Sequence, residues 1–151
     1  METEKILEKL RDMFLENGQE EVDFEQGILS MRLRGFGSIA NTAEGEFSFL
    51  VSDESEYGFF DCRIEVLDEI REESLTLICA VMTDINAELP LGGFAWDPVE
   101  NTVFYYLRTP VLKTMSEEEL MEEADSCVAL SLGVAERYCP GLIKASEVIG
   151  G

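Results

Sequence analysis

Histidine is absent from the 151 residues of this chain. Imidazole is the commonest general base, a frequent metal ligand, and the group that activates the nucleophile in Ser-His and Cys-His pairs. None of these arrangements can be built from this chain alone. No other catalytic signature stands in their place, so we expect a protein that is not an enzyme.

The chain also lacks a Cys-x-x-Cys motif, because its four cysteines lie far apart: Cys62, Cys79, Cys127 and Cys139. Each stands where an apolar residue is expected, which is typical of a buried, reduced thiol rather than a disulfide or a zinc ligand. A P-loop and a complete dinucleotide-binding glycine pattern are missing too. We therefore expect no metal and no cofactor.

Positive charge is scarce. Lys and Arg number 11 and Asp and Glu number 32, which gives a formal net charge of −21. An anion of this size repels the phosphates of nucleic acids and the anionic inner leaflet of a membrane, so we expect neither as a partner. Two explanations of the acidity stay open: it keeps the protein in solution, or it attracts a basic or unfolded partner.

Long apolar runs and a basic N-terminus are lacking as well. The longest apolar run is too short to span a bilayer. The Glu-rich, amphipathic start of the chain differs from the basic start and apolar core of a signal peptide. Together with the reduced cysteines, these features predict a cytoplasmic protein.

What the chain does contain is enough apolar sequence for one core. Hydrophobic residues make up 46% of it, and a domain of this length buries about 70% of the surface of its unfolded chain. We expect a single domain over residues 1–151. The periodicity of apolar residues predicts helices over 3–17, 69–88 and 116–139, and strands over 29–34, 47–51, 59–66, 91–96 and 102–108.

This order, α-β-β-β-α-β-β-α, predicts an α+β two-layer sandwich in which helices pack on an antiparallel five-stranded sheet. Turn-rich segments at 35–38 with 44–45, and at 53–56, are the expected hairpin connections. Across the strands, Arg32, Arg34 and Arg63 are expected to face Asp61 and Glu65.

The last helix carries a recognisable start and an expected stop. Ser116 followed by Glu119 forms a capping box ahead of an apolar run. Pro140-Gly141 is expected to end this helix and leave a short turn or helix over residues 142–148.

The middle helix, residues 69–88, is apolar around most of its circumference. Such a helix needs cover on two sides, one from its own sheet and one from another helix of the chain or from a partner molecule. We favour a partner molecule as this second cover and expect part of the helix to lie in a homodimer interface.

The segment from Ile85 to Arg108 joins that helix to the last pair of strands. It contains Asn86, then Leu91-Gly-Gly-Phe94, then Asp97, and then Val103-Phe-Tyr105. This series resembles the YbjN-like family, whose members are often labelled bacterial sensory-transduction regulators. The strand here reads Phe-Tyr-Tyr-Leu-Arg, a small departure from the family's Tyr-Arg.

The resemblance implies a fold like that of type III secretion chaperones, which are small, acidic, dimeric proteins that hold extended segments of a client. It implies a non-enzymatic, chaperone-like or regulatory module that acts as a homodimer and holds a segment of a protein partner. The family offers no catalytic residues to assign. Our candidate interface residues are the following: Ile78, Val81, Met82, Ile85, Phe94, Trp96 and Tyr106.

The alternative is a small enzyme or ligand-binding domain that uses clustered carboxylates near the Trp96 hairpin. It predicts a closed pocket that contains acids with raised pKa values. Trp96 and its aromatic neighbours are more easily explained by packing within the hairpin.

Overall fold

The computed structural model describes residues 2–148, which form a mixed α+β fold with three helices and six strands. In chain order the elements are α1 (Thr3–Glu16), β1 (Val22–Glu25), β2 (Ile28–Arg34), β3 (Thr42–Leu50), β4 (Tyr57–Leu67), α2 (Glu72–Glu88), β5 (Gly93–Asp97), β6 (Thr102–Leu112) and α3 (Glu117–Glu147). The strands form one open antiparallel sheet in the order β1-β2-β3-β4-β6-β5.

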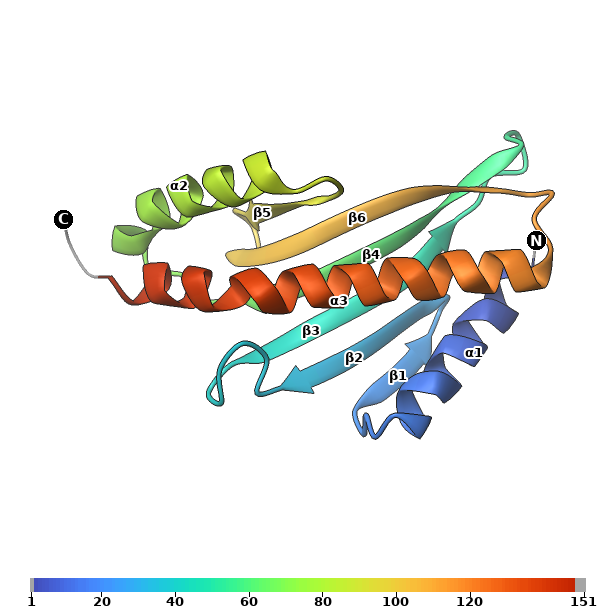
Figure 1. Ribbon diagram of the computed structural model, residues 1–151, viewed down its shortest axis with the longest axis horizontal. Coiled ribbons are helices and arrows are strands. Elements are labelled where there is room, and N and C mark those ends of the chain that lie inside the picture. Colours follow the sequence, from blue (N-terminus) through green and yellow to red (C-terminus); the bar gives the residue numbers. More distant parts are fainter. Residues whose placement is uncertain (1, 149–151) are drawn as a thin grey trace.

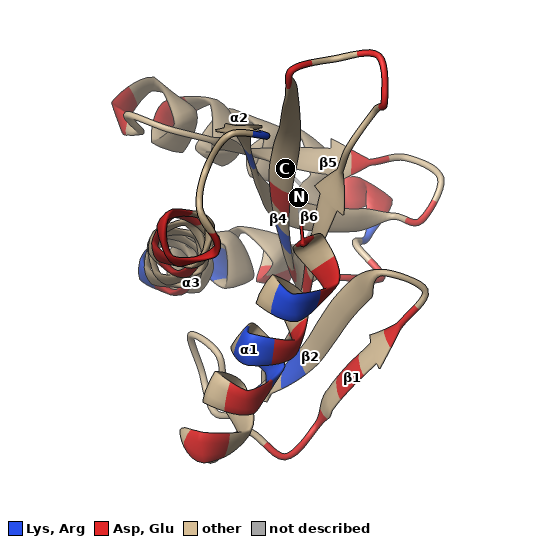
Figure 2. Ribbon diagram, turned by 90° about the vertical axis from the view of Figure 1, so that its right-hand side faces the viewer, with Lys and Arg blue, Asp and Glu red and all other residues tan. Residues whose placement is uncertain are grey.

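All three helices lie on the same face of this sheet (Figures 1 and 2). The 31-residue α3 runs along the length of the sheet, α1 packs beside it over β1 and β2, and α2 lies near β5. At 1.5 Å per residue α3 spans about 46 Å, and it contacts α1, α2, β4 and β6. Among residues 2–148, no helix lies on the opposite face of the sheet.

Strand alternation places the core between the sheet and the helices. In β4, Phe60, Cys62, Ile64 and Val66 are fully buried, while the residues between them are half-buried. Val103 and Tyr105 of β6 are buried on the same side, as the period-2 pattern predicts. The expected α+β class, with helices packed on an antiparallel sheet, is therefore present.

The sheet has six strands where the sequence predicted five. The extra strand, β1, pairs with β2 through Val22↔Met31 and Phe24↔Leu29. It escaped prediction because only two of its four residues are apolar and acidic residues surround them. Pairing with a neighbouring strand, rather than the strand's own pattern, decides this element.

β3 begins at Thr42, five residues before the predicted start, so residues 44–45 lie inside a strand and not in a turn. Gly45 faces the core, where a Cβ atom would lie 3.3 Å from the ring of Phe47 and 3.4 Å from Ile64. Glycine is read as a turn signal from sequence, but here it makes room for two neighbouring side chains.

α3 does not end at Pro140. The helix continues through it to Glu147. Proline removes the hydrogen bond to the carbonyl four residues earlier, at Glu136, but both residues are exposed, so water can satisfy that carbonyl. Beyond the proline, Leu142 and Ala145 are buried and hold the last turns on the core.

The start of α3 is as predicted. The Ser116 hydroxyl accepts from the Glu119 amide and the Glu119 carboxylate accepts from the Ser116 amide, both at 3.1 Å.

Within residues 2–148 there is no helix whose length and apolar character would let it cross a membrane.

α2 receives its second cover from within the chain. Its buried residues lie on one side, Ile78 among them, and the helix contacts both α3 and β5. Ser74 at its start donates to the carbonyl oxygen of Ser146 in α3. Leu77 remains 40% exposed on the outer side.

The four cysteines are free thiols, and three of them are buried: Cys62, Cys127 and Cys139. Burial raises the pKa of Cys62 to about 12 and that of Cys139 to about 11. These thiols fill space in the core, as their apolar sequence positions predict.

We predict that iodoacetamide at pH 8 modifies half-buried Cys79 first in the native protein. A raised pKa leaves a smaller fraction of reactive thiolate, so Cys62 and Cys139 should react at least ~100-fold more slowly than in urea-unfolded protein. Mass spectrometry of tryptic peptides against time measures this. Equal rates for Cys62 and Cys79 in the native state would contradict it.

Candidate functional site

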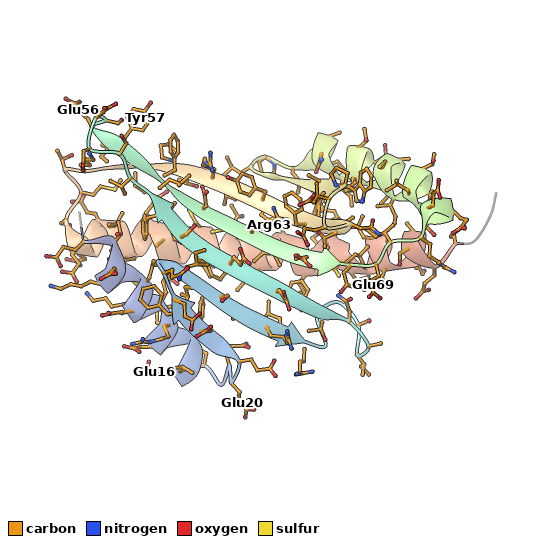
Figure 3. The ribbon with its side chains drawn as sticks, turned by 180° about the vertical axis from the view of Figure 1, so that it is seen from behind. Glu16, Glu20, Glu56, Tyr57, Arg63 and Glu69 are labelled. Carbon is orange, nitrogen blue, oxygen red and sulfur yellow. The ribbon has the colours of Figure 1, made fainter. Side chains whose placement is uncertain are left out.

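The uncovered face of the sheet divides into two halves. Over β2 and β3 it carries charged pairs, such as Arg32 with Glu44 at 3.0 Å. Over β4, β6 and β5 it carries aromatic side chains with arginines and carboxylates between them. Figure 3 shows this face, with Arg63 on the side of the sheet turned away from α3. The aromatic half is the candidate site.

Arg63 stands at the centre of this half. Its guanidinium carbon lies 3.7 Å from the ring centroid of Phe104, and one of its nitrogens lies 3.6 Å from the Asp97 carboxylate. Hydrogen bonds from the backbone amides of Val99 and Glu100 hold the pKa of Asp97 below its usual value, and Arg63 adds to this effect. The guanidinium thus lies between the Asp97 carboxylate at one end and the aromatic face of Phe104 beneath it.

A second cluster lies next to Arg63 on the same face and consists of Asp61 in β4 with Tyr106 and Arg108 in β6. Arg108 donates two hydrogen bonds to Asp61, Nε at 2.7 Å and Nη2 at 2.9 Å, and the Tyr106 hydroxyl donates to the same carboxylate at 3.3 Å. The bond to Asp61 raises the pKa of Arg108, and burial with the nearby Asp61 raises that of Tyr106. This network keeps the phenol neutral and the guanidinium charged.

Between these clusters and the end of β5 lies an open recess of about 730 Å³. Its lining is mainly apolar and aromatic, with two arginines and no carboxylate: Arg63, Leu91, Gly92, Gly93, Phe94, Ala95, Phe104, Tyr106, Leu107 and Arg108. Its size and composition are those of a binding recess, with a few polar groups at an apolar surface.

Asn86 joins α2 to β5, the strand that borders the recess. Its side-chain nitrogen donates to the Phe94 carbonyl at 2.9 Å, and its side-chain oxygen accepts from the Phe94 amide at 2.8 Å. The carboxamide thereby takes the place that a neighbouring strand would occupy on the outer edge of β5.

The loop between α2 and β5 closes over Tyr105. The Tyr105 hydroxyl donates to the Leu91 carbonyl at 3.0 Å. Gly92 follows with φ +69°, and a Cβ atom there would lie 2.4 Å from that hydroxyl oxygen. Glycine is required at this position because both the backbone conformation and the available space exclude a side chain. The strand therefore begins at Gly93 rather than at Leu91.

The structure places the seven candidate interface residues in two groups. Ile78, Met82, Ile85 and Phe94 lie in the hydrophobic core. Val81, Trp96 and Tyr106 are half-buried. Of the seven, Phe94 and Tyr106 line the recess. The four buried side chains are packed within the chain, and Phe94 also borders the recess.

Trp96 faces the covered side of the sheet and is held by the turn that follows it. Its indole nitrogen donates to Asn101 at 3.0 Å, and Asn101 in turn donates to the Ile70 carbonyl at 2.9 Å. This tryptophan anchors the β5–β6 turn to the start of α2.

Sequence reasoning missed the pairing of the charged residues on this face. Asp61 was expected to face Arg32, Arg34 or Arg63, but its partner is Arg108, directly opposite it in the β4–β6 register. Arg63 reaches Asp97 instead. The alternation in both strands was a usable signal, but the order of the strands in the sheet was needed to pair them.

Within residues 2–148, the carboxylates near the Trp96 hairpin do not line the recess beside it, whereas the alternative predicted a closed pocket that contains acids. Asp97 and Asp61 are each bound to an arginine. Glu65 has a pKa raised by burial and by Glu44, but it is not among the residues that line the recess. Across residues 2–148, no group of three or more acidic or cysteine side chains is arranged to hold a metal ion.

The fold is similar to that of a protein of known structure, YbjN from E. coli, which is described as a proposed transcription regulator. The two share 12% sequence identity over 91% of each chain, with a TM-score of 0.53. No protein-family model matches the sequence, and no curated protein is significantly similar to it. The likeness shows a YbjN-like fold.

We predict that Asn86→Ala lowers the free energy of unfolding by about 1–3 kcal/mol, because two hydrogen bonds to the edge of β5 are lost together. Urea denaturation measures the loss, and the Phe94 amide should exchange with solvent faster. The control is Asn17→Ala, at an exposed residue that ends α1 and whose cap hydrogen bonds are made by its backbone amide. Equal stability of both variants would contradict the role of Asn86.

Proposed function

We propose that this protein is a non-enzymatic regulatory module that binds a segment of a partner protein on the uncovered face of its sheet. The observation that supports this most is the 730 Å³ recess bordered by Arg63, Phe104, Tyr106 and Arg108. Aromatic residues and arginine are the types that carry most binding energy at protein interfaces. No helix of the described chain covers them.

The arrangement suits a protein surface better than a site for chemistry. The two arginines are already neutralised by Asp97 and Asp61, so neither is free to bind a small anion without displacing a carboxylate. Their flat guanidinium groups still offer faces and edges to a partner. The regulatory description of YbjN, whose fold is similar, supports the same class of function.

We predict that a double variant, Phe104→Ala with Tyr106→Ala, recovers at least ~10-fold less partner than the wild type in affinity purification from the native host. Ile28→Ala is the matched control, because this residue is exposed on a distant strand of the same sheet. Both variants are first checked by circular dichroism. Equal recovery by all three proteins, or no partner under several growth conditions, would count against the proposal.

We further propose that the module acts as a homodimer through the outer side of α2. There Leu77 is 40% exposed, and Val81 is half-buried one turn further on. Apolar residues on the outside of a helix whose inner side is already packed are available to a second copy.

Multi-angle light scattering should give a mass near 34 kDa, twice the 16.9 kDa of one chain. Leu77→Glu combined with Val81→Glu should shift this mass to that of the monomer, whereas Ala129→Glu, on the exposed side of α3, should not. Most stable dimers are populated at a concentration of about 100 µM. A wild-type protein that is strictly monomeric there would contradict the proposed dimer.

A further inference from the structure

β6 is longer than the strand that pairs with its outer side. β5 covers β6 from Thr102 to Tyr106, whereas β6 continues to Leu112. Figure 1 shows this part of β6 extending past the end of β5. Within residues 2–148, no strand pairs with the outer side of β6 beyond Tyr106. The recess lies where this free edge begins.

The direction of the free backbone groups follows from Asn86. Because the Phe94 amide and carbonyl point to Asn86, its partner Tyr105 points its own groups away from β5. The next residue, Tyr106, therefore faces β5, and alternation gives the same direction to Arg108, Pro110 and Leu112. The Lys113 amide, which donates to Glu56 beside β4, agrees with this alternation.

The edge thus offers an unpaired donor and acceptor at Arg108, an acceptor at Pro110 and a donor at Leu112. Arg108, Pro110 and Leu112 are all exposed. Unpaired strand groups of this kind are a template for another extended chain.

We propose that an extended, basic segment of the partner adds to this edge as a further strand, in line with β5, and places an apolar side chain in the recess. This inference rests on the proposed function and specifies the partner's conformation and charge. Five residues, 108–112, give a pairing length of about 17 Å.

The charge of the occupant follows from the surroundings of the edge. The chain has 21 more acidic than basic residues. The loop beside the C-terminal end of β6 carries three exposed acids, Asp53, Glu54 and Glu56. The backbone carbonyl of Glu56 accepts a hydrogen bond from the Lys113 amide. On the helix side, Glu123 lies 4.0 Å from the Cys127 sulfur, which lies 3.3 Å from the Thr109 hydroxyl. A segment with lysine or arginine between apolar residues complements these acids.

A second copy of this chain fits the edge less well. Two β6 edges paired about a two-fold axis at Pro110 would bring together two residues without an amide donor. Proline on an exposed edge is a common protection against such self-pairing. The amide donors of Arg108 and Leu112, on either side of Pro110, remain available to a partner segment without proline at the paired positions.

The other edges of the sheet are less suitable. Asn86 occupies the outer groups of Phe94 in β5. β1 has only four residues and lies away from the recess, at the opposite side of the sheet. β6 is the edge that combines free backbone groups with an apolar recess.

The test uses a synthetic ten-residue peptide that alternates lysine with valine and phenylalanine, and an analogue with glutamate in place of lysine. By amide hydrogen exchange, the lysine peptide should slow exchange at Arg108 and Leu112 at least 10-fold. Its affinity should fall as salt rises from 50 to 300 mM, and the glutamate analogue should bind at least 10-fold more weakly (expected of paired charges near a surface).

Pro110→Ala restores a donor at the centre of the edge, so this variant should bind the lysine peptide about 2- to 10-fold more tightly. Arg32→Ala, on the charged half of the sheet, should leave the affinity unchanged. Tighter binding by Pro110→Ala cannot arise from loss of folding, because a damaged variant would bind more weakly.

Several results would overturn the inference: unchanged exchange at Arg108 and Leu112, protection of β1 instead, equal affinity for the glutamate analogue, or no binding of the lysine peptide at low salt. Shifts in the NMR signals of Phe104 and Tyr106 without protection of the β6 edge would reject strand addition but agree with the proposed function. Loss of partner recovery by the Phe104 and Tyr106 variant decides that function separately.

Discussion

The placement of all three helices on one face of the sheet is the constraint on which the rest of this structure depends. It divides every strand into a side that must be apolar and a side that meets solvent. On the covered side, Phe60, Ile64 and Tyr105 are fully buried. On the other side, aromatic rings are partly shielded by arginines, which are held in place by Asp61 and Asp97. A sheet with one bare face has to make this second surface from its own side chains, and that surface is available for binding.

Asn86 connects this layer arrangement to the shape of the candidate site. Its side chain makes two hydrogen bonds to the backbone of Phe94 and thereby links α2 to the outer edge of β5. The loop that precedes β5 has to pass over Tyr105, which only glycine at position 92 permits. β5 is consequently short, and β6 extends past it. The recess and the free edge are two results of one short strand.

Charge decides what such a surface favours. Arg63 and Arg108 are already paired with carboxylates. The field near the site is therefore set by the net negative charge of the chain. Long-range attraction to an acidic protein generally favours basic partners, and the proposed binding would add short-range contacts at the recess and the strand edge. A fold similar to that of YbjN does not by itself assign a role, because one fold serves many functions. The proposed role rests on Arg63, Phe104, Tyr106 and the β6 edge.

The amino-acid sequence by itself determined the α+β class, the buried thiols, the capping box at Ser116 and the two faces of β6, because each depends on local periodicity or on neighbouring residues. It did not predict β1, the continuation of α3 through Pro140, or the partners of Asp61. Those depend on strand order and on packing between segments far apart in the chain. The candidate residues on α2 show the same division. Their apolar character was predicted from the sequence, but only the tertiary structure shows that Ile78, Met82 and Ile85 are buried and that Arg63, Phe104, Tyr106 and Arg108 line the recess. Only the folded chain brings β4, β6 and the end of β5 together, and the recess exists because β5 stops where β6 does not.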